Sequence, residues 1–443
     1  MPAERSLAVL GVATLLLVGT VGAAWMAWVT IGIDLLLVLA AAVDHRRASL
    51  TSLSASRRLP PLLAQGSAAD VEVRIETSGA RPVTVVARES LHPALAPAPL
   101  RTRVELPPEG LVSWQYRMVP RRRGEHVLGP LTVRVLGPWR LAWAERDLIP
   151  PERHRVYPQV RWEGRVGQLL ALAQRRELGR APLRFRGFGS EPYALREYLP
   201  GDPPHKIHWK ATARHGRLVT REDTWERGAR LLILLDAARA MASIGEPRQD
   251  GQAAFSRSKL DYALAAVLAL VRVATARGDR VSVLAFSDRV ERLVRVGSST
   301  RGISAAYQAL FDLDARLVEP AYDLAAEAAL DADSRRATVV LVTSVVDLAA
   351  TELLRESLLR LERRHRPILV NLEDPELAAL AASAPERPEE AFAKVASLEI
   401  LLANRRLARR LRRSGVRVVT TPADRLTLET LEAYLALFKS RAA

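Results

Sequence analysis

The residues most able to do chemistry gather in one run, from Arg184 to Glu222, and at a carboxylate shortly after it. The run mixes glycine, proline, tryptophan, tyrosine and both signs of charge, which core helices and strands do not do. An apolar segment, LLILLD, follows and ends on Asp236. Open α/β sheets place ligand sites at the carboxyl ends of their strands. We therefore interpret the run either as the centre of a site or as an elaborate linker.

Several kinds of catalytic and metal chemistry are excluded by residue type. The chain has no cysteine, which excludes disulfides, thiolate metal sites and cysteine catalysis. It contains neither a G-x-S-x-G nucleophile motif nor a P-loop. His205 and His208 stand close together, but no third ligand is near them in the sequence. We interpret both histidines as surface or hydrogen-bonding residues.

The chain is long and basic. Its 443 residues allow two or three domains. The formal net charge of +16 suits nucleic acid, an anionic membrane face or an acidic partner, and it also fits many solvated helix faces. The strongest basic patch is the predicted helix end Ala403–Gly415. Anionic lipid, an acidic partner and plain solvation all remain open for this patch.

Residues 1–47 predict a transmembrane helical hairpin. The apolar stretch contains a single ionisable side chain, Asp34, and is about two bilayer crossings long. We expect two helices, Ser6–Gly22 and Trp25–Val43. Arginine flanks both ends of the hairpin and is absent from its turn. The positive-inside rule then places the bulk of the chain on the cytoplasmic side of the cell inner membrane, with the lipid bilayer as a partner.

Residues 50–160 predict a β-rich, sandwich-like domain. Apolar and polar residues alternate in short runs such as Val71–Gly79, and proline and glycine separate these runs at regular intervals. This pattern is typical of antiparallel strands joined by turns. Residues 161–228 are predicted to be a linker followed by the charged signature segment.

Residues 229–443 alternate apolar strands with helices, which predicts a doubly wound α/β domain. Such strands are apolar throughout because helices cover both faces of a mostly parallel sheet. The expected strands are Arg230–Asp236, Arg280–Ser287, Ala337–Ser344, Pro367–Leu372 and Val416–Thr420. The expected helices are Ser258–Arg277, Ile303–Asp312, Leu348–Arg364, Glu389–Arg413 and Leu426–Lys439.

The charged run resembles the signature of the bacterial "domain of unknown function 58" family. The matching pattern is G-x-G-S-E-P-Y-x-L-R-E-Y-x-P-G-D, then I-H-W-K-A-T-A-R, then G-R-L-V-T-R-E. The resemblance implies a von Willebrand factor A-like C-terminal domain and frequent association with MoxR-type AAA+ ATPases, with no established biochemical activity. The signature or interaction residues that we select are Gly187, Gly189, Glu191, Arg196, Tyr198, Gly201, Asp202, Trp209 and Arg214.

Domains of the von Willebrand factor A type often hold Mg²⁺ with a D-x-S-x-S loop and with a Thr and an Asp from later loops. Here the first loop reads D-A-A-R-A from Asp236, and alanine cannot coordinate a hard cation. Thr300 and Asp347 are left to supply oxygens, and Val345 replaces an expected carboxylate. We therefore predict a degenerate site around Asp236, Thr300 and Asp347, with no bound metal and no other cofactor.

Two physical roles fit the charged signature, and they are compatible. Its charged side chains can form a buried ion-pair network that docks the run onto the α/β domain. Alternatively, Tyr198 and Trp209 can serve with arginines as anchors on a docking face for a partner.

Functions from three classes remain open. We expect a membrane-anchored, non-enzymatic interaction scaffold that works with a MoxR-type AAA+ ATPase in the assembly or maturation of a client protein. The first alternative is a hydrolase or a metal-dependent adhesion-type ligand binder that uses Asp236. The second is a basic nucleic-acid-binding protein. We expect no nucleic-acid partner, because no exposed aromatics are interleaved with the arginines of the basic helix.

Overall fold

The structure is a computed structural model of the 443-residue chain. It describes residues 24–95, 100–160, 164–178, 191–197, 207–224, 229–243, 257–297 and 300–439. The chain divides into two compact units, Met1–Gln159 and Val160–Ala443.

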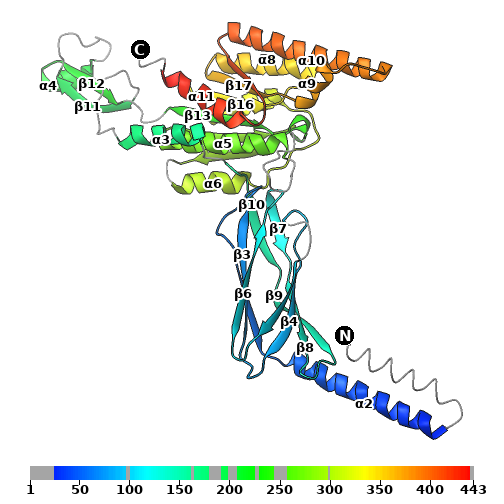
Figure 1. Cartoon of the computed structure of the whole chain (residues 1–443). Helices are drawn as coiled ribbons and strands as arrows, with labels where there is room; N and C mark the ends of the chain where they lie inside the picture. Colours follow the sequence, from blue (N-terminus) through cyan, green and yellow to red (C-terminus); the bar gives the residue numbers. More distant parts are fainter. Residues whose placement is uncertain are drawn as a thin grey trace. The chain divides into compact units, whose positions relative to one another are not determined.

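The first unit consists mainly of β-strands that pack around one apolar core (Figure 1). The described strands of this unit form three sheets, with the strand orders β1-β3-β6, β2-β10-β7 and β5-β4-β8-β9. Strand pairs in these sheets are antiparallel except for β2 with β10. The strands are β1 (Leu53–Arg58), β2 (Leu63–Ala64), β3 (Ala69–Thr77), β4 (Val83–Glu89), β5 (Leu100–Leu106), β6 (Leu111–Met118), β7 (Gly124–Leu128), β8 (Leu131–Leu136), β9 (Trp143–Ile149) and β10 (Glu152–Tyr157).

Helix α2 (Ala24–Ser49) also belongs to this unit, and its last turns pack on β8 and β9. The link is the fully buried carboxylate of Asp44. It accepts hydrogen bonds from the backbone N–H groups of Trp139 (2.8 Å), Leu141 (2.9 Å) and Ala142 (3.1 Å). A charged side chain of the helix is thus satisfied entirely by the loop between β8 and β9.

The membrane-spanning hairpin predicted over residues 1–47 is wrong. Among the residues that the structure describes, no helix combines the length and the apolar character that crossing a bilayer requires. Helix α2 continues beyond the predicted end at Val43 to Ser49, because its polar last turns have hydrogen-bond partners in the β-strand unit. The first predicted helix, Ser6–Gly22, lies outside the described residues.

The second unit is organised around a six-stranded sheet of order β15-β14-β13-β16-β17-β18. Neighbouring strands are parallel, except that the edge strand β15 runs antiparallel to β14. The strands are β13 (Arg230–Asp236), β14 (Arg280–Phe286), β15 (Val290–Val296), β16 (Thr338–Thr343), β17 (Arg366–Leu372) and β18 (Arg417–Thr421). With its helices, this sheet makes the chain a mixed α/β protein.

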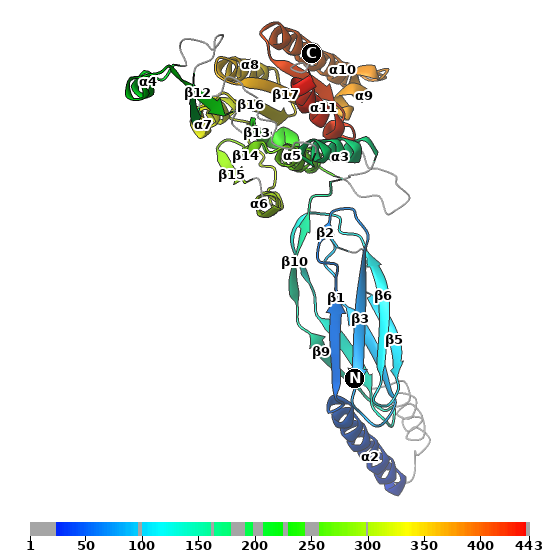
Figure 2. The same ribbon diagram turned by 90° about the vertical axis from the view of Figure 1, so that its left-hand side faces the viewer.

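Helices cover both faces of the sheet, as Figures 1 and 2 show. On one face, α3 (Gly164–Leu178), α5 (Lys259–Ala276), α6 (Thr300–Leu310) and α11 (Leu426–Lys439) share a core with the sheet. The other face is covered by α7 (Tyr322–Ala332), α8 (Leu348–Glu362) and α10 (Pro388–Arg413), and α9 (Pro375–Ala382) packs against α10. Successive residues of β13 enter opposite cores, which is why this strand is apolar throughout.

Candidate functional site

The carboxyl ends of β13 and β16 meet at the centre of the six-stranded sheet. From β13 the chain passes to β14 on one side, and it later returns to β16 on the other side. Such a switch point is where open α/β folds bind their ligands. Asp236 ends β13 and Thr343 ends β16, so their side chains come together there.

Asp236 is fully buried, and hydrogen bonds occupy both of its oxygens. The backbone N–H of Ala238 donates to Oδ1 at 2.8 Å, and the hydroxyl of Thr343 donates to Oδ2 at 2.6 Å. The hydroxyl of Tyr322 lies 2.9 Å from Thr343 Oγ1 and 3.5 Å from Asp236 Oδ2. The carboxylate is therefore enclosed by donors from β16, α7 and its own loop.

Burial raises the pKa of the Asp236 carboxyl to about 6. The hydrogen bonds from Thr343, the Ala238 N–H and Tyr322 act in the opposite direction and lower this pKa. Burial also raises the pKa of Tyr322 well above its ordinary value, and the neighbouring carboxylate adds to the shift. The folded protein therefore binds the Asp236 proton more tightly than the unfolded chain, where aspartate titrates near pH 4.

We expect Asp236→Asn to remove part of the pH dependence of stability. Because the folded pKa is raised, the stabilisation is fully present below about pH 4 and is lost as the pH rises through about 6, a change of about 3 kcal/mol. Urea unfolding between pH 4 and 7 measures this slope, which should be smaller in the variant. The exposed Asp424 provides the control Asp424→Asn, which should keep the wild-type slope. Parallel profiles for wild type and Asp236→Asn would contradict the assignment.

Asp347 caps a helix and pairs with an arginine. Its Oδ1 accepts a hydrogen bond from the N–H of Ala349 at 3.0 Å, which caps the start of α8. Its Oδ2 lies 3.5 Å from the guanidinium of Arg239, which also lies 2.8 Å from a carboxylate oxygen of Glu319. Arg239 thus pairs with Asp347 and Glu319, whereas Asp236 is satisfied by uncharged donors.

A second cluster of polar side chains lies at the ends of β16 and β17. Lys259, in the first turn of α5, is buried, with its Nζ 2.6 Å from Asp374 Oδ2 and 3.1 Å from Ser344 Oγ. Ser344 donates in turn to the carbonyl of Leu372. An ammonium group of the protein itself therefore lies inside this end of the sheet, neutralised by a carboxylate.

The described residues do not fit a Mg²⁺ site. In that part of the chain, no group of three or more His, Asp or Glu side chains could hold a metal ion. Both oxygens of Asp236 accept hydrogen bonds, and those of Asp347 cap a helix and contact Arg239. A hard cation needs several available oxygens. Thr300 begins α6, and its side chain lies outside the described residues.

The signature segment contains a β-hairpin with a short helix in its connection. Strand β11 (Glu191–Glu197) pairs antiparallel with β12 (Val219–Thr224), and α4 (Trp209–His215) lies between them in the sequence. His208 caps α4 by accepting a hydrogen bond from the Ala211 N–H at 3.1 Å. Gly216 ends the helix in the left-handed conformation with φ of 64°, which glycine adopts at little cost.

The described signature side chains are mostly exposed. Trp209 is 67% exposed, and Arg214 is exposed as well. Glu197 forms an exposed ion pair with Arg217 at 3.4 Å. The backbone of Glu191 and Arg196 lies in β11, but their side chains lie outside the described residues. Those that lie wholly outside them are Gly187, Gly189, Tyr198, Gly201 and Asp202.

Sequence reasoning missed the partners that complete the strand-end clusters. Thr343 is the last residue of β16, and the rule that parallel strands end at one edge could have pointed to it beside Asp236. The same rule applies to Asp374, which follows β17 closely. Lys259 carried a weaker signal, a lone charge at the start of an apolar helix. Nothing in the local pattern pointed to Tyr322.

Solved structures resemble parts of this chain only weakly. One is the CARDB domain of a Pyrococcus furiosus protein in complex with di-metal ions, with 15% identity, 24% of this chain and 88% of that chain covered, and a TM-score of 0.19. A β-glucosidase from Listeria innocua has 14% identity and a TM-score of 0.14, and the match covers 24% of this chain and 16% of that chain. Proximal thread matrix protein 1 from the mussel byssus has 14% identity and a TM-score of 0.25, and the match covers 47% of this chain and 45% of that chain. This chain thus spans less than half of the latter two chains.

The family comparison covers more of the chain. No curated protein matches it. One family model, described as "Protein of unknown function DUF58", matches residues 194–417, from the signature hairpin to the start of β18. This match spans just over half of the 443 residues. The chain therefore belongs to the DUF58 family.

Proposed function

We propose that this protein is a non-enzymatic interaction scaffold that works with a MoxR-type AAA+ ATPase in the assembly or maturation of a client protein. The observation that carries the proposal is the exposure of Trp209 and Arg214 within the family signature. Tryptophan and arginine are the side chains that most often anchor protein interfaces. An exposed indole that is 67% accessible contributes little to its own fold, so a partner is the natural source of its burial.

We infer further that residues 229–443 form a von Willebrand factor A-like domain. The strand order supports this, with an antiparallel edge strand β15 and a central strand β13 that ends on Asp236. Alanine at the two hydroxyl positions after Asp236 supports binding of partners without Mg²⁺ or another cofactor.

A hydrolase that uses Asp236 is the second candidate. A carboxyl with a strongly raised pKa at a switch point is a feature of functional sites. Against it, a general acid or base must reach its substrate, and Asp236 is buried with both oxygens bonded. Turnover that disappears in Asp236→Asn while the fold is kept would favour this candidate.

Trp209→Ala and Arg214→Glu test the scaffold. We expect each to weaken binding of the purified full chain to a MoxR-type ATPase by about tenfold or more, which corresponds to the loss of one good anchor residue. Biolayer interferometry with and without ATP measures the dissociation constant. Circular dichroism should be unchanged, because both side chains are exposed.

Matched controls come from exposed residues elsewhere in the same unit. Leu317 is 83% exposed and Arg425 is exposed, so Leu317→Ala and Arg425→Glu remove comparable side chains. Both should bind as the wild type does. Absence of ATPase binding in either nucleotide state would refute the proposal.

Duplex DNA binding that weakens steeply with salt would instead favour the nucleic-acid alternative. The predicted location at the inner membrane stays a prediction that cell fractionation tests.

A further inference from the structure

Helix α10 has one buried face and one exposed face that carries large apolar side chains. Its buried residues are Ser397, Leu407, Ala408 and Leu411. The exposed ones are Phe392 (77% exposed), Val395, Leu398 and Leu402. Residues three or four positions apart lie on the same face of a helix. These four side chains therefore form a continuous row, which we call the apolar stripe.

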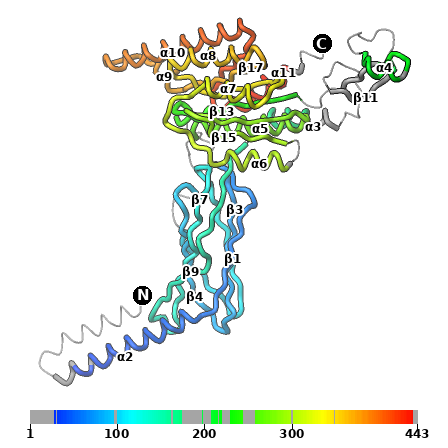
Figure 3. The backbone as a smooth tube through the Cα atoms, turned by 180° about the vertical axis from the view of Figure 1, so that it is seen from behind, coloured from blue at the N-terminus to red at the C-terminus, as the bar shows by residue number. Residues whose placement is uncertain are grey.

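Helices α8 and α9 lie next to α10. The N-terminal half of α10 extends past α8, with α9 beside it (Figures 1 and 3). Leu380 of α9 and Leu353 of α8 are also large, exposed apolar side chains. Scattered exposed apolar residues are ordinary, but gathered ones mark interaction surfaces. The apolar stripe gathers four such side chains on one helix face, which marks this face of α10 as an interaction surface.

The same face of α10 becomes basic toward its C-terminal end. Arg406, Arg409 and Arg413 continue the spacing of the apolar stripe and are exposed. None of these three arginines forms an ion pair with another residue in the described part of the chain. The helix dipole favours cations only in the last turn, so it does not account for Arg406 and Arg409. The face is thus apolar in its first half and cationic in its second.

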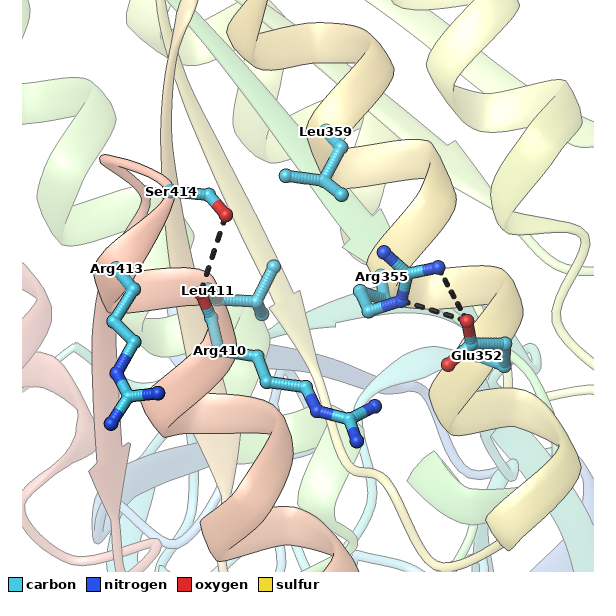
Figure 4. Close-up of a pocket in the computed structure, with 7 residues that line it drawn as sticks. All are labelled: Glu352, Arg355, Leu359, Arg410, Leu411, Arg413 and Ser414. Carbon is cyan, nitrogen blue, oxygen red and sulfur yellow. Dashed lines mark hydrogen bonds and ion pairs between the residues drawn. The ribbon is translucent and has the colours of Figure 1, made fainter.

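A hollow of about 370 Å³ lies between α8 and the basic end of α10. Figure 4 shows Arg410 extending from α10 toward Arg355 and Glu352 of α8. Arg355 Nε donates to Glu352 Oε1 at 2.8 Å, so that carboxylate is already engaged. Arg413 also lines the hollow, which gives three guanidinium groups against one carboxylate. Carboxylates of a bound partner would reduce this excess of positive charge, because guanidinium binds carboxylates with paired hydrogen bonds.

We propose that this α8–α10 surface binds an acidic amphipathic helix of a protein partner, with apolar residues on the apolar stripe and carboxylates in the arginine-lined hollow. The stripe and the basic end together span about 30 Å at 1.5 Å per residue, which matches a partner helix of about six turns. Apolar anchors in a groove with matching charge are the usual mode of helix recognition. The inference rests on the scaffold role, for which it supplies the binding surface.

An anionic membrane is a poorer match for the surface. Helices that lie in a membrane interface carry apolar and basic residues on opposite faces. In α10 the two kinds follow one another along a single face, so a flat bilayer would bring Arg409 to the same depth as Leu402. Glu399 is also exposed in the apolar half and would repel anionic headgroups. A partner helix can match such an order residue by residue, whereas a bilayer cannot.

The test uses a synthetic, fluorescein-labelled 22-residue helical peptide with leucines in one half and glutamates in the other, in both orders of the halves. Fluorescence anisotropy with the full chain should detect binding of one order. Phe392→Ser/Val395→Ser and Arg410→Glu/Arg413→Glu should each weaken it at least tenfold. The exposed controls Leu317→Ser and Arg425→Glu should bind within about twofold of wild type, as remote surface changes do. Equal binding by all variants would overturn the proposal.

Two further arms separate the alternatives. Binding to phosphatidylglycerol vesicles, with no binding of either peptide, would overturn the protein partner in favour of a membrane. The MoxR-type ATPase is measured against the same variants. If it binds every α8–α10 variant as wild type but is lost in Trp209→Ala, the scaffold role stands and this surface assignment fails. If it does not bind at all while the peptide depends on Phe392 and Arg410, the surface stands and the ATPase partnership fails.

Discussion

Replacing Asp374 by alanine should destabilise the second unit by about 3–5 kcal/mol, because the ammonium of Lys259 would be left buried without its counter-ion. Lys259 Nζ lies 2.6 Å from Asp374 Oδ2, and the side chains of Lys259 and Asp374 are 2% and 15% exposed. The hydroxyl of Ser344 would remain 3.1 Å from the ammonium, but a hydroxyl does not neutralise charge. Urea unfolding followed by circular dichroism measures the free-energy loss.

Two companion variants separate the charge from other effects. Asp374 also caps α9 through a hydrogen bond from the Glu376 N–H at 3.0 Å, and Asp374→Asn keeps that acceptor while removing the charge. It should lose nearly as much stability as alanine if the ion pair dominates. Lys259→Met with Asp374→Leu should recover most of the loss, since a buried pair replaced by apolar groups is often neutral. A loss below about 1 kcal/mol in Asp374→Ala and Asp374→Asn would refute the buried-charge argument.

Asp44→Ala should destabilise the first unit by about 3–5 kcal/mol. The substitution removes a charged acceptor from three backbone N–H groups, of Trp139, Leu141 and Ala142, and leaves them unpaired at a protected site. Because Asp44 belongs to α2, the end of this helix should also loosen from β8 and β9. Hydrogen exchange at the three amides reports that loosening directly.

Two further variants at the same contact test how much of the stability loss comes from the Asp44 carboxylate. Asp44→Asn keeps one acceptor oxygen and should lose about half as much stability, since hydrogen bonds to a charged acceptor are the stronger ones. Gly137→Ala places a Cβ 2.3 Å from the Asp44 carboxylate, and the clash should displace the same loop. Unchanged amide protection in both Asp44→Ala and Gly137→Ala would show that α2 does not depend on this carboxylate.

Much of the second unit could be predicted from periodicity. Strand β13 has its predicted bounds, Arg230–Asp236, and α10 begins one residue before the predicted helix Glu389–Arg413. Strands covered on both faces are apolar throughout, so they are easy to recognise. Strand β15, VERLVRV, was not expected because it lies at the sheet edge and alternates with charge. The hairpin of β11 and β12 was hidden for the same reason, since its strands are largely polar.

The membrane hairpin failed because apolar composition says nothing about what a helix contacts. The stretch before Asp44 suggested a second crossing that ends at Val43. In the structure, α2 continues to Ser49, and Asp44 turns inward to the loop between β8 and β9. The partners of that carboxylate lie more than ninety residues away in the sequence, so no local window could reveal them.

The sequence by itself determined which chemical groups this protein contains: a signature run, a strand that ends on Asp236, and alanines where a cation would need hydroxyls. Only the tertiary structure decided what those groups contact. Thr343 reaches Asp236 across 107 residues, and Asp374 reaches Lys259 across 115. Parallel strands gather their carboxyl ends at one edge whatever their separation in the chain, and burial there makes each polar group depend on its partner. Likewise, the local period predicted α10, but packing against the sheet decided which of its faces is left to solvent.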